Sequence, residues 1–233
     1  MTVMTASVLS GCADQAKAPE ITDEETQKTV ETEDVATETI VPETDADATA
    51  VSEITVSSSE VFDQLALPVP GDKVAVIETD MGTIKIKLFT DLSPEISKNF
   101  EELAKANMYN AVPFHRVVKD FMIQTGDFTN KNGTGGYSYK GPGTKLADEV
   151  TPVLKHLYGT VSMANSGPDT NGSQFFIVTN QGGTAFLDGS YSIFGQVYEG
   201  MDVAMQIADL QMPNTEKPSR GVNMTKVEVT TMQ

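Results

Sequence analysis

The stretch FHRVVKDFMIQTGDF, residues 114–128, decides the fold of this chain. A second stretch, VSMANSGPDTNGSQFF, follows at residues 161–176. Together they supply an arginine, side-chain amides and several large apolar side chains, without an acid–base pair, a thiol nucleophile or a set of metal ligands. Such residues can hold an apolar ring and hydrogen-bond a peptide backbone without making or breaking covalent bonds.

Both stretches closely resemble the cyclophilin family of peptidyl-prolyl cis–trans isomerases. The family pattern has a Phe-His-Arg…Phe-Met-x-Gln segment, a Gly-Thr-Gly-Gly loop, here at residues 133–136, and a Met-Ala-Asn…Gln-Phe-Phe segment. All three occur in the family order, and the resemblance covers roughly residues 72–230. It implies a mainly β fold, a closed eight-stranded antiparallel barrel capped by two α-helices. It also implies an enzyme that accelerates rotation about Xaa-Pro bonds during protein folding.

The resemblance makes Arg116 the catalytic residue. An Xaa-Pro bond is a tertiary amide whose rotation barrier, about 18–20 kcal/mol, comes from conjugation of the nitrogen lone pair with the carbonyl. A donor that favours a pyramidal nitrogen lowers this barrier. A guanidinium suits the task because it stays charged and presents its donors in a rigid plane. A purely structural salt bridge is the alternative role for Arg116.

The resemblance also assigns the substrate-binding residues. Those that match the apolar pocket for the proline ring are Phe121, Met122, Phe176 and Leu187, although such side chains at this spacing are also typical of a plain core. Gln124 matches the residue that hydrogen-bonds the substrate backbone and orients the arginine. The other predicted substrate contacts are Ala164, Asn165, Ser166, Gln174, Phe186 and Tyr191.

Two positions depart from the family pattern, and two histidines need a role. Phe186 stands where many members have Trp, which hydrogen-bonds the inhibitor cyclosporin, and Tyr191 stands where His is common. Sensitivity to the drug is therefore open. The pKa of a histidine suits acid–base catalysis, but isomerisation transfers no proton, so we expect a structural role for His115. We expect His156, which has no motif partner, at the surface or at an end of the barrel.

Charge is unevenly spread along the chain. Its 233 residues carry a formal net charge of −17, and residues 13–64 hold 15 of the 33 acidic but only 2 of the 16 basic residues. Because an acidic segment repels phosphates and anionic surfaces, no nucleic-acid binding is expected. Two histidines and one cysteine form no cluster with zinc-ligand spacing, so neither a metal nor a cofactor is predicted.

Three regions are predicted: a truncated signal-like segment at 1–12, a disordered acidic linker at 13–66, and the isomerase domain at 67–233. The first region ends in Leu-Ser-Gly-Cys12, which is similar to the lipobox of bacterial lipoproteins. No basic residue precedes Lys17, so either the start is truncated or the match is accidental. The lipoprotein interpretation predicts a lipid anchor on Cys12 and a bacterial cell membrane location, with the domain on the extracytoplasmic side.

The linker prediction rests on composition. Residues 13–66 are rich in Thr, Glu, Asp and Ala and poor in aromatic residues, so they cannot bury enough apolar area to offset their chain entropy. Such a segment serves either as a tether or as a solvated tail without a specific task. No run of 18 apolar residues occurs in the chain, so no membrane span is predicted.

Periodicity predicts the main elements of the third region. Residues 74–77 are all apolar, and in residues 84–88 apolar side chains alternate with lysines. Together the two segments indicate a β-hairpin. Ser93 followed by Pro94 predicts an N-cap. The helical spacing of Ile96, Phe100, Leu103 and Ala104 predicts one apolar face of a helix that ends near Asn107. A second short helix is predicted at 202–208 and a closing strand at 225–229.

Three functions are open at this point. The first is an isomerase that acts, as a monomer, on Pro-containing unfolded or partly folded polypeptides. The second is a binding module of the same fold with little turnover, and the third is a surface interaction protein whose acidic linker is the functional part. Arg116 favours turnover, because binding alone does not need the guanidinium.

Overall fold

The hairpin predicted from the alternating residues 84–88 is confirmed in the computed structural model, which describes residues 62–233. Strand β1 (Lys73–Thr79) pairs antiparallel with β2 (Gly82–Leu88). Ile84 and Ile86 are fully buried, whereas the lysines beside them are only half-buried. The period-two pattern therefore turns one face of β2 into the core.

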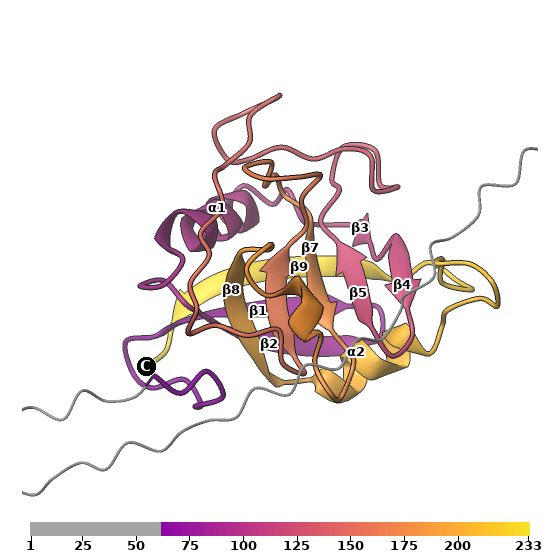
Figure 1. Ribbon diagram of the computed structural model, residues 1–233. Helices are drawn as coiled ribbons and strands as arrows, with labels where there is room; N and C mark the ends of the chain where they lie inside the picture. Colours follow the sequence, from indigo (N-terminus) through magenta and orange to yellow (C-terminus); the bar gives the residue numbers. More distant parts are fainter. Residues whose placement is uncertain (1–61) are drawn as a thin grey trace, which may run out of the picture. The chain divides into compact units, whose positions relative to one another are not determined.

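Within residues 62–233, nine strands form one antiparallel sheet in the order β3-β9-β1-β2-β8-β6-β7-β5-β4 (Figure 1). The remaining strands are β3 (Val112–Pro113), β4 (Arg116–Val118), β5 (Met122–Thr125), β6 (Thr160–Met163), β7 (Phe175–Val178), β8 (Ile193–Glu199) and β9 (Asn223–Thr231). The predicted closing strand is thus confirmed as β9, which pairs with β1.

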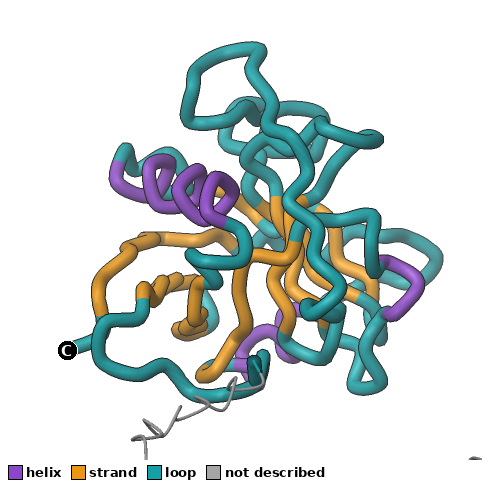
Figure 2. The backbone as a smooth tube through the Cα atoms, turned by 60° about the vertical axis from the view of Figure 1, so that its left-hand side comes forward, coloured by secondary structure: helices purple, strands orange, loops and turns teal. Residues whose placement is uncertain are grey.

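The sheet is curled, and its two edge strands, β3 and β4, follow each other in the chain (Figure 2). Near this connection the Phe114 N–H donates to the Val222 carbonyl at 2.9 Å, and the Thr125 hydroxyl donates to the Pro113 carbonyl at 2.9 Å. No ladder pairs β3 with β4 in the described residues. The predicted closed eight-stranded barrel is therefore not confirmed; the structure has a curled antiparallel sheet of nine strands.

Both predicted helices are present, as α1 (Pro94–Lys105) and α2 (Met201–Ala208), and a short 3₁₀ helix, η1, spans Ala185–Leu187. Figures 1 and 2 show α1 and α2 on opposite sides of the curled sheet. Ile96 and Phe100, on the predicted apolar face of α1, are fully buried in the core. Burial of this face fixes α1 against the sheet.

The start of α1 differs from the prediction. The Ser93 side chain makes no cap bond and donates instead to the Ile193 carbonyl. The Glu149 carboxylate accepts from the N–H groups of Glu95 and Ile96, at 3.1 and 2.8 Å. An anion is favourable there because the first N–H groups of a helix lack partners inside the helix. The cap is thus supplied by a residue distant in sequence.

Side-chain alternation separates the core from the other face of the sheet. Val117 in β4 lies opposite Ile123 in β5, and both are fully buried in the core. In the adjacent row, Arg116 lies opposite Gln124, and Gln124 lies opposite Phe176 in β7. Successive side chains of a strand point to opposite faces. This row therefore faces away from the core.

Candidate active site

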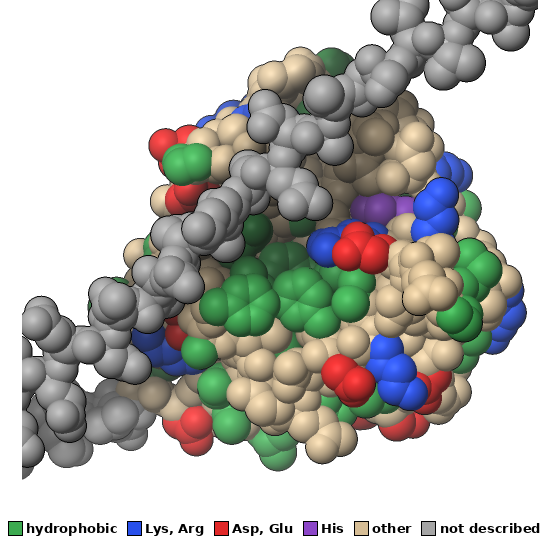
Figure 3. Space-filling model, turned by 45° about the vertical axis from the view of Figure 1, so that its right-hand side comes forward, with side chains coloured by type: hydrophobic (Ala, Val, Ile, Leu, Met, Phe, Trp, Pro, Cys, Tyr) green, Lys and Arg blue, Asp and Glu red, His purple; other side chains and the backbone are tan. Residues whose placement is uncertain are grey.

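The row of Arg116, Gln124 and Phe176 borders a hollow of about 310 Å³. Its lining residues are Arg116, Phe121, Met122, Gln124, Ala164, Asn165, Phe176, Leu187 and Tyr191, all of them predicted from the sequence. Figure 3 shows apolar side chains gathered on one face of the molecule, with a basic and an acidic group in contact beside them. The hollow therefore combines apolar walls with a guanidinium at its edge.

The apolar walls form a cluster of their own, separate from the main core. Met122, Phe176 and Leu187 are 1%, 5% and 8% exposed, and Phe121 and Tyr191 pack against them. Buried walls around a hollow that is open on one side are typical of a site for an apolar group. The sequence alone could not distinguish these residues from ordinary core, but their position on the outer face of the sheet does.

Two predicted contacts, Ser166 and Gln174, lie beside this hollow. They line an adjoining hollow of about 170 Å³, which shares Gln124, Ala164 and Asn165 with the first. The structure therefore brings all five residues to one surface depression with two compartments.

Phe186 lines neither hollow. Its side chain is 75% exposed and stacks on the Phe121 ring, with the ring centroids 5.7 Å apart. Leu187, the next residue of η1, is buried in the apolar cluster. An exposed aromatic surface thus extends outward from the rim of the larger hollow.

Arg116 is held from two sides. Its Nη1 donates to Gln124 Oε1 at 3.3 Å, while Nε and Nη2 donate to the two carboxylate oxygens of Glu216 at 2.7 and 3.2 Å. The hydrogen bond from Arg116 lowers the pKa of Glu216. The sequence analysis missed Glu216 because it is 100 residues from Arg116 and lies in a loop without periodic pattern.

Gln124 is held in turn by Gln174. The Gln124 Nε2 donates to Gln174 Oε1 at 2.9 Å, and the Gln174 Nε2 donates to the carbonyls of Gly133 and Gly135 at 2.9 and 2.8 Å. Each amide uses its oxygen toward one neighbour and its nitrogen toward the next, so the orientation of both is determined. Two amides therefore connect the Gly-Thr-Gly-Gly loop to the guanidinium of Arg116.

Asp127, which the sequence analysis did not assign, organises this loop. Its buried carboxylate accepts hydrogen bonds from five main-chain N–H groups within residues 129–135. Burial alone would raise the pKa of Asp127, but these N–H groups hold it well below its ordinary value. The loop that positions Gln174 is thus wrapped around a fixed negative charge.

His115 packs against the same loop. A side-chain carbon placed on Gly133 would lie 2.9 Å from a ring carbon of His115, and the φ of Gly133 is +94°. Only glycine fits such a close approach in the left-handed region. Burial lowers the pKa of His115, which keeps its ring neutral at pH 7. These contacts agree with the structural role expected for His115.

His156 is buried, so the expectation of a surface position was wrong. Its ring is stacked on Phe176, with centroids 6.0 Å apart and planes 10° apart. Nδ1 lies 2.9 Å from the Asp188 carboxylate, and Nε2 lies 3.2 Å from the Ser162 hydroxyl. This arrangement fits a neutral ring with its proton on Nδ1. Burial lowers the pKa of His156 more than Asp188 raises it. Because both nitrogens have partners, the ring can be buried behind the pocket wall.

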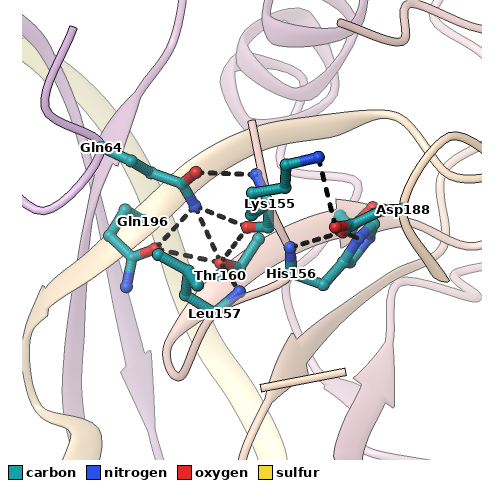
Figure 4. Close-up of polar contacts among 8 residues, drawn as sticks. Gln64, Lys155, His156, Leu157, Thr160, Asp188 and Gln196 are labelled. Atoms are coloured by element: carbon teal, nitrogen blue, oxygen red, sulfur yellow. Dashed lines mark hydrogen bonds and ion pairs between the residues drawn. The ribbon is translucent and has the colours of Figure 1, made fainter. Parts of the chain in front are cut away.

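A further residue missed by the sequence analysis, Gln64, fastens the segment before His156 (Figure 4). Its Nε2 lies 2.8 Å from the Lys155 carbonyl oxygen and 3.0 Å from Thr160 Oγ1, and its Oε1 accepts from the Lys155 N–H at 2.9 Å. Gln64 is 6% exposed. Although it precedes the predicted domain boundary at residue 67, Gln64 is part of the packing next to the site.

The fold and the site define a β protein with a surface groove that joins an apolar pocket to a fixed guanidinium. Residues 74–229 match the family model described as cyclophilin type peptidyl-prolyl cis-trans isomerase/CLD. The chain belongs to this family and is a peptidyl-prolyl cis–trans isomerase.

Related proteins are similar over almost their whole length. Peptidyl-prolyl cis-trans isomerase-like 1 of Neurospora crassa is 44% identical over 154 residues, which cover 66% of this chain and 91% of that protein. Its mouse namesake is 42% identical over 151 residues, 64% of this chain and 88% of that protein.

Solved structures of cyclophilin-type isomerases have a similar fold. A crystal structure of a Cryptosporidium parvum cyclophilin type peptidyl-prolyl cis-trans isomerase has a TM-score of 0.65 and 32% identity, covering 70% of this chain and 99% of that one. The same protein in the presence of the dipeptide Ala-Pro has a TM-score of 0.63 and 33% identity, covering 68% of this chain and 99% of that one.

The predicted location is wrong. A bacterial cell membrane, with the domain held outside it by a lipid, is contradicted by the relatives, which come from Neurospora crassa, Arabidopsis thaliana and mouse. Cys12, the predicted attachment point, lies outside the described residues. Among residues 62–233, no helix is long and apolar enough to cross a bilayer.

Proposed function

We propose that Arg116 catalyses rotation about Xaa-Pro bonds in unfolded or partly folded polypeptides, with the proline ring held in the 310 Å³ hollow. The observation that carries this proposal is the position of Arg116, which lines the apolar hollow and is hydrogen-bonded to Gln124. The guanidinium is therefore fixed beside the place that an apolar ring would occupy.

Phe121, Met122, Phe176 and Leu187 hold the ring, and Arg116 acts on the amide. As the bond twists, the prolyl nitrogen becomes pyramidal and its lone pair is released from conjugation with the carbonyl. A hydrogen bond from Arg116 to this nitrogen is stronger in the twisted state than in either planar isomer. Only such a difference accelerates the reaction. No proton is transferred, which agrees with the neutral, packed state of both histidines.

The substrate backbone lies along residues 164–166. Within residues 62–233, the main-chain N–H and C=O of Asn165 form no hydrogen bond, so both are free to pair with an extended peptide. Ser166 and Gln174 line the adjoining hollow, where they contact the residue before the Xaa-Pro pair. Tyr191 lines the proline pocket, and the exposed Phe186 stacks on Phe121 at its rim.

The isomerase domain, which includes Gln64, carries this activity as a monomer, and residues 13–61 are not needed for it. Deletion of residues 13–61, which spares the buried Gln64, separates this function from that of an interaction protein. Isomerisation of an Ala-Pro peptide should be unchanged in the shortened chain.

Turnover of the same peptide tests the role of Arg116. The wild type should interconvert the two isomers, and Arg116→Ala should bind the peptide with little turnover. A wild type that binds the peptide without interconverting the isomers would indicate a binding module instead.

A further inference from the structure

The loop between α2 and β9 lies beside β4, the strand that carries Arg116 (Figure 1). The Val117 N–H donates to the Glu216 carbonyl at 2.7 Å, and the Lys119 N–H donates to Gln211 Oε1 at 2.7 Å. Inside the loop, the Met212 N–H donates to the Lys217 carbonyl at 2.9 Å. The main chain of Glu216 is therefore fixed next to Arg116 independently of its side chain.

The Glu216 carboxylate occupies one edge of the guanidinium. It accepts from Nε and Nη2 of Arg116, which is the two-point geometry that gives an arginine–carboxylate pair its directional specificity. Nη1, at another edge of the same plane, donates to Gln124 Oε1. The guanidinium can rotate only if it breaks bonds on both sides.

The ion pair between Arg116 and Glu216 contributes little to the stability of the fold. The side chains of Arg116 and Glu216 are 37% and 59% exposed, and exposed pairs contribute little to stability. Its main effect is on the charge of the groove. In the described part of the chain, Arg116 and Lys145 are the charged residues that line the two hollows, and no carboxylate lines either. Glu216 therefore neutralises one of two cations at the groove.

We infer that Glu216 is a positioning residue for Arg116 and also sets the charge preference of the groove, an inference that rests on the proposed role of Arg116. With Glu216 in place, the outer edge of the guanidinium is occupied, and a substrate carboxylate cannot take it. Without Glu216, that edge becomes a two-point site for Asp and Glu side chains.

The test uses the full chain and peptides of the types Ala-Xaa-Pro-Ala and Ala-Ala-Pro-Xaa, in which Xaa is Ala, Glu or Lys. Glu216→Gln should lower kcat for the neutral peptide several-fold, because Arg116 is less well held. At low salt it should also lower KM for the Glu peptides relative to the Lys peptides by about fivefold, the size expected of one added unit charge near the surface. The charge preference should vanish at high salt, whereas the loss in kcat should remain.

Two variants make the result specific. Glu216→Asp retains the charge and should retain the wild-type preference among the peptides. Glu199→Gln makes the same change of charge at a glutamate of similar exposure, 60%, which pairs with Lys85 and lines neither hollow. It should leave all peptides unaffected.

The inference is overturned if Glu216→Gln changes neither kcat nor the preference between Glu and Lys peptides while Arg116→Ala is inactive. If Arg116→Ala is as active as the wild type, the proposed function itself fails. The two failures are therefore distinguishable in one set of measurements.

Discussion

Arg116 and Gln124 lie opposite each other in the neighbouring strands β4 and β5, and Arg116 Nη1 donates to Gln124 Oε1 at 3.3 Å. The same register places Phe176 of β7 opposite Gln124. The sheet ladder thus brings a guanidinium, an amide and an aromatic wall into one row. The spacing of the motifs in the sequence is a consequence of this row.

The hydrogen bonds that connect Gln174 through Gln124 to Arg116 should affect turnover more than substrate binding. Gln174→Ala removes the acceptor for Gln124 and both bonds to the Gly133 and Gly135 carbonyls. Loss of the hydrogen bond that orients Gln124 costs on the order of 1 kcal/mol, so we expect kcat to fall about fivefold. Steady-state kinetics on an Ala-Pro peptide gives kcat and KM separately. Gln206, an exposed residue of α2, provides the matched control, and Gln206→Ala should leave kcat and KM unchanged. A rise in KM alone would show that Gln174 only contacts substrate.

Gln64 should stabilise the domain, although its segment looked like linker. Gln64→Ala leaves the Lys155 N–H without its partner beneath the surface, which costs about 1–3 kcal/mol in the free energy of unfolding. Urea unfolding followed by near-UV circular dichroism measures the change. Leu67→Ala alters a side chain of the same segment that is 68% exposed, and we expect a change within about 0.5 kcal/mol. Equal stability of Gln64→Ala and the wild type would mean that the segment does not pack on the domain in solution.

The element predictions that succeeded are those that depend on local pattern. Alternation identified β2, and three- to four-residue spacing identified α1, because burial of one face imposes these periods. The contacts that were missed are all long-range. Glu149 at the start of α1, Glu216 beside Arg116, and Gln64 beside Lys155 each pair with a residue more than 50 positions away. No periodicity marks them, since a single polar side chain leaves no pattern in its neighbours.

The burial of His156 also depends on long-range contacts that the sequence does not reveal. A histidine without a motif partner is expected at the surface, because burial of a polar ring is costly unless both nitrogens are bonded. Asp188 and Ser162 supply these bonds. Asp188 lies 32 residues from His156 in the sequence, so this partner could not be identified before the fold was known.

The burial of His156 should make stability depend on pH. Its pKa in the folded protein lies below 6.5, the value of an unperturbed histidine, so the unfolded chain binds more protons between these two values. The free energy of unfolding should therefore fall as the pH is lowered from 7.5 to 5.5. Carboxylates with lowered pKa contribute only at lower pH.

Urea unfolding at the two pH values tests this prediction. His156→Gln, which retains a donor toward Asp188, should be less stable overall and should lose less stability on acidification than the wild type. Part of the dependence should remain, because burial also lowers the pKa of His115. An identical loss of stability in His156→Gln and the wild type would show that His156 does not titrate in this interval.

The role of Arg116 is best tested by exchange spectroscopy on an Ala-Pro peptide, which reports binding and cis–trans interconversion in one sample. Arg116→Ala should reduce the interconversion rate by roughly 10²-fold or more, as for removal of one preorganised donor to the transition state. Peptide binding should weaken much less, because Phe121, Met122 and Phe176 still hold the ring. Arg116→Lys should recover little, since an ammonium lacks the planar fork. Interconversion by Arg116→Ala at the wild-type rate would contradict the assignment of Arg116 as the catalytic residue.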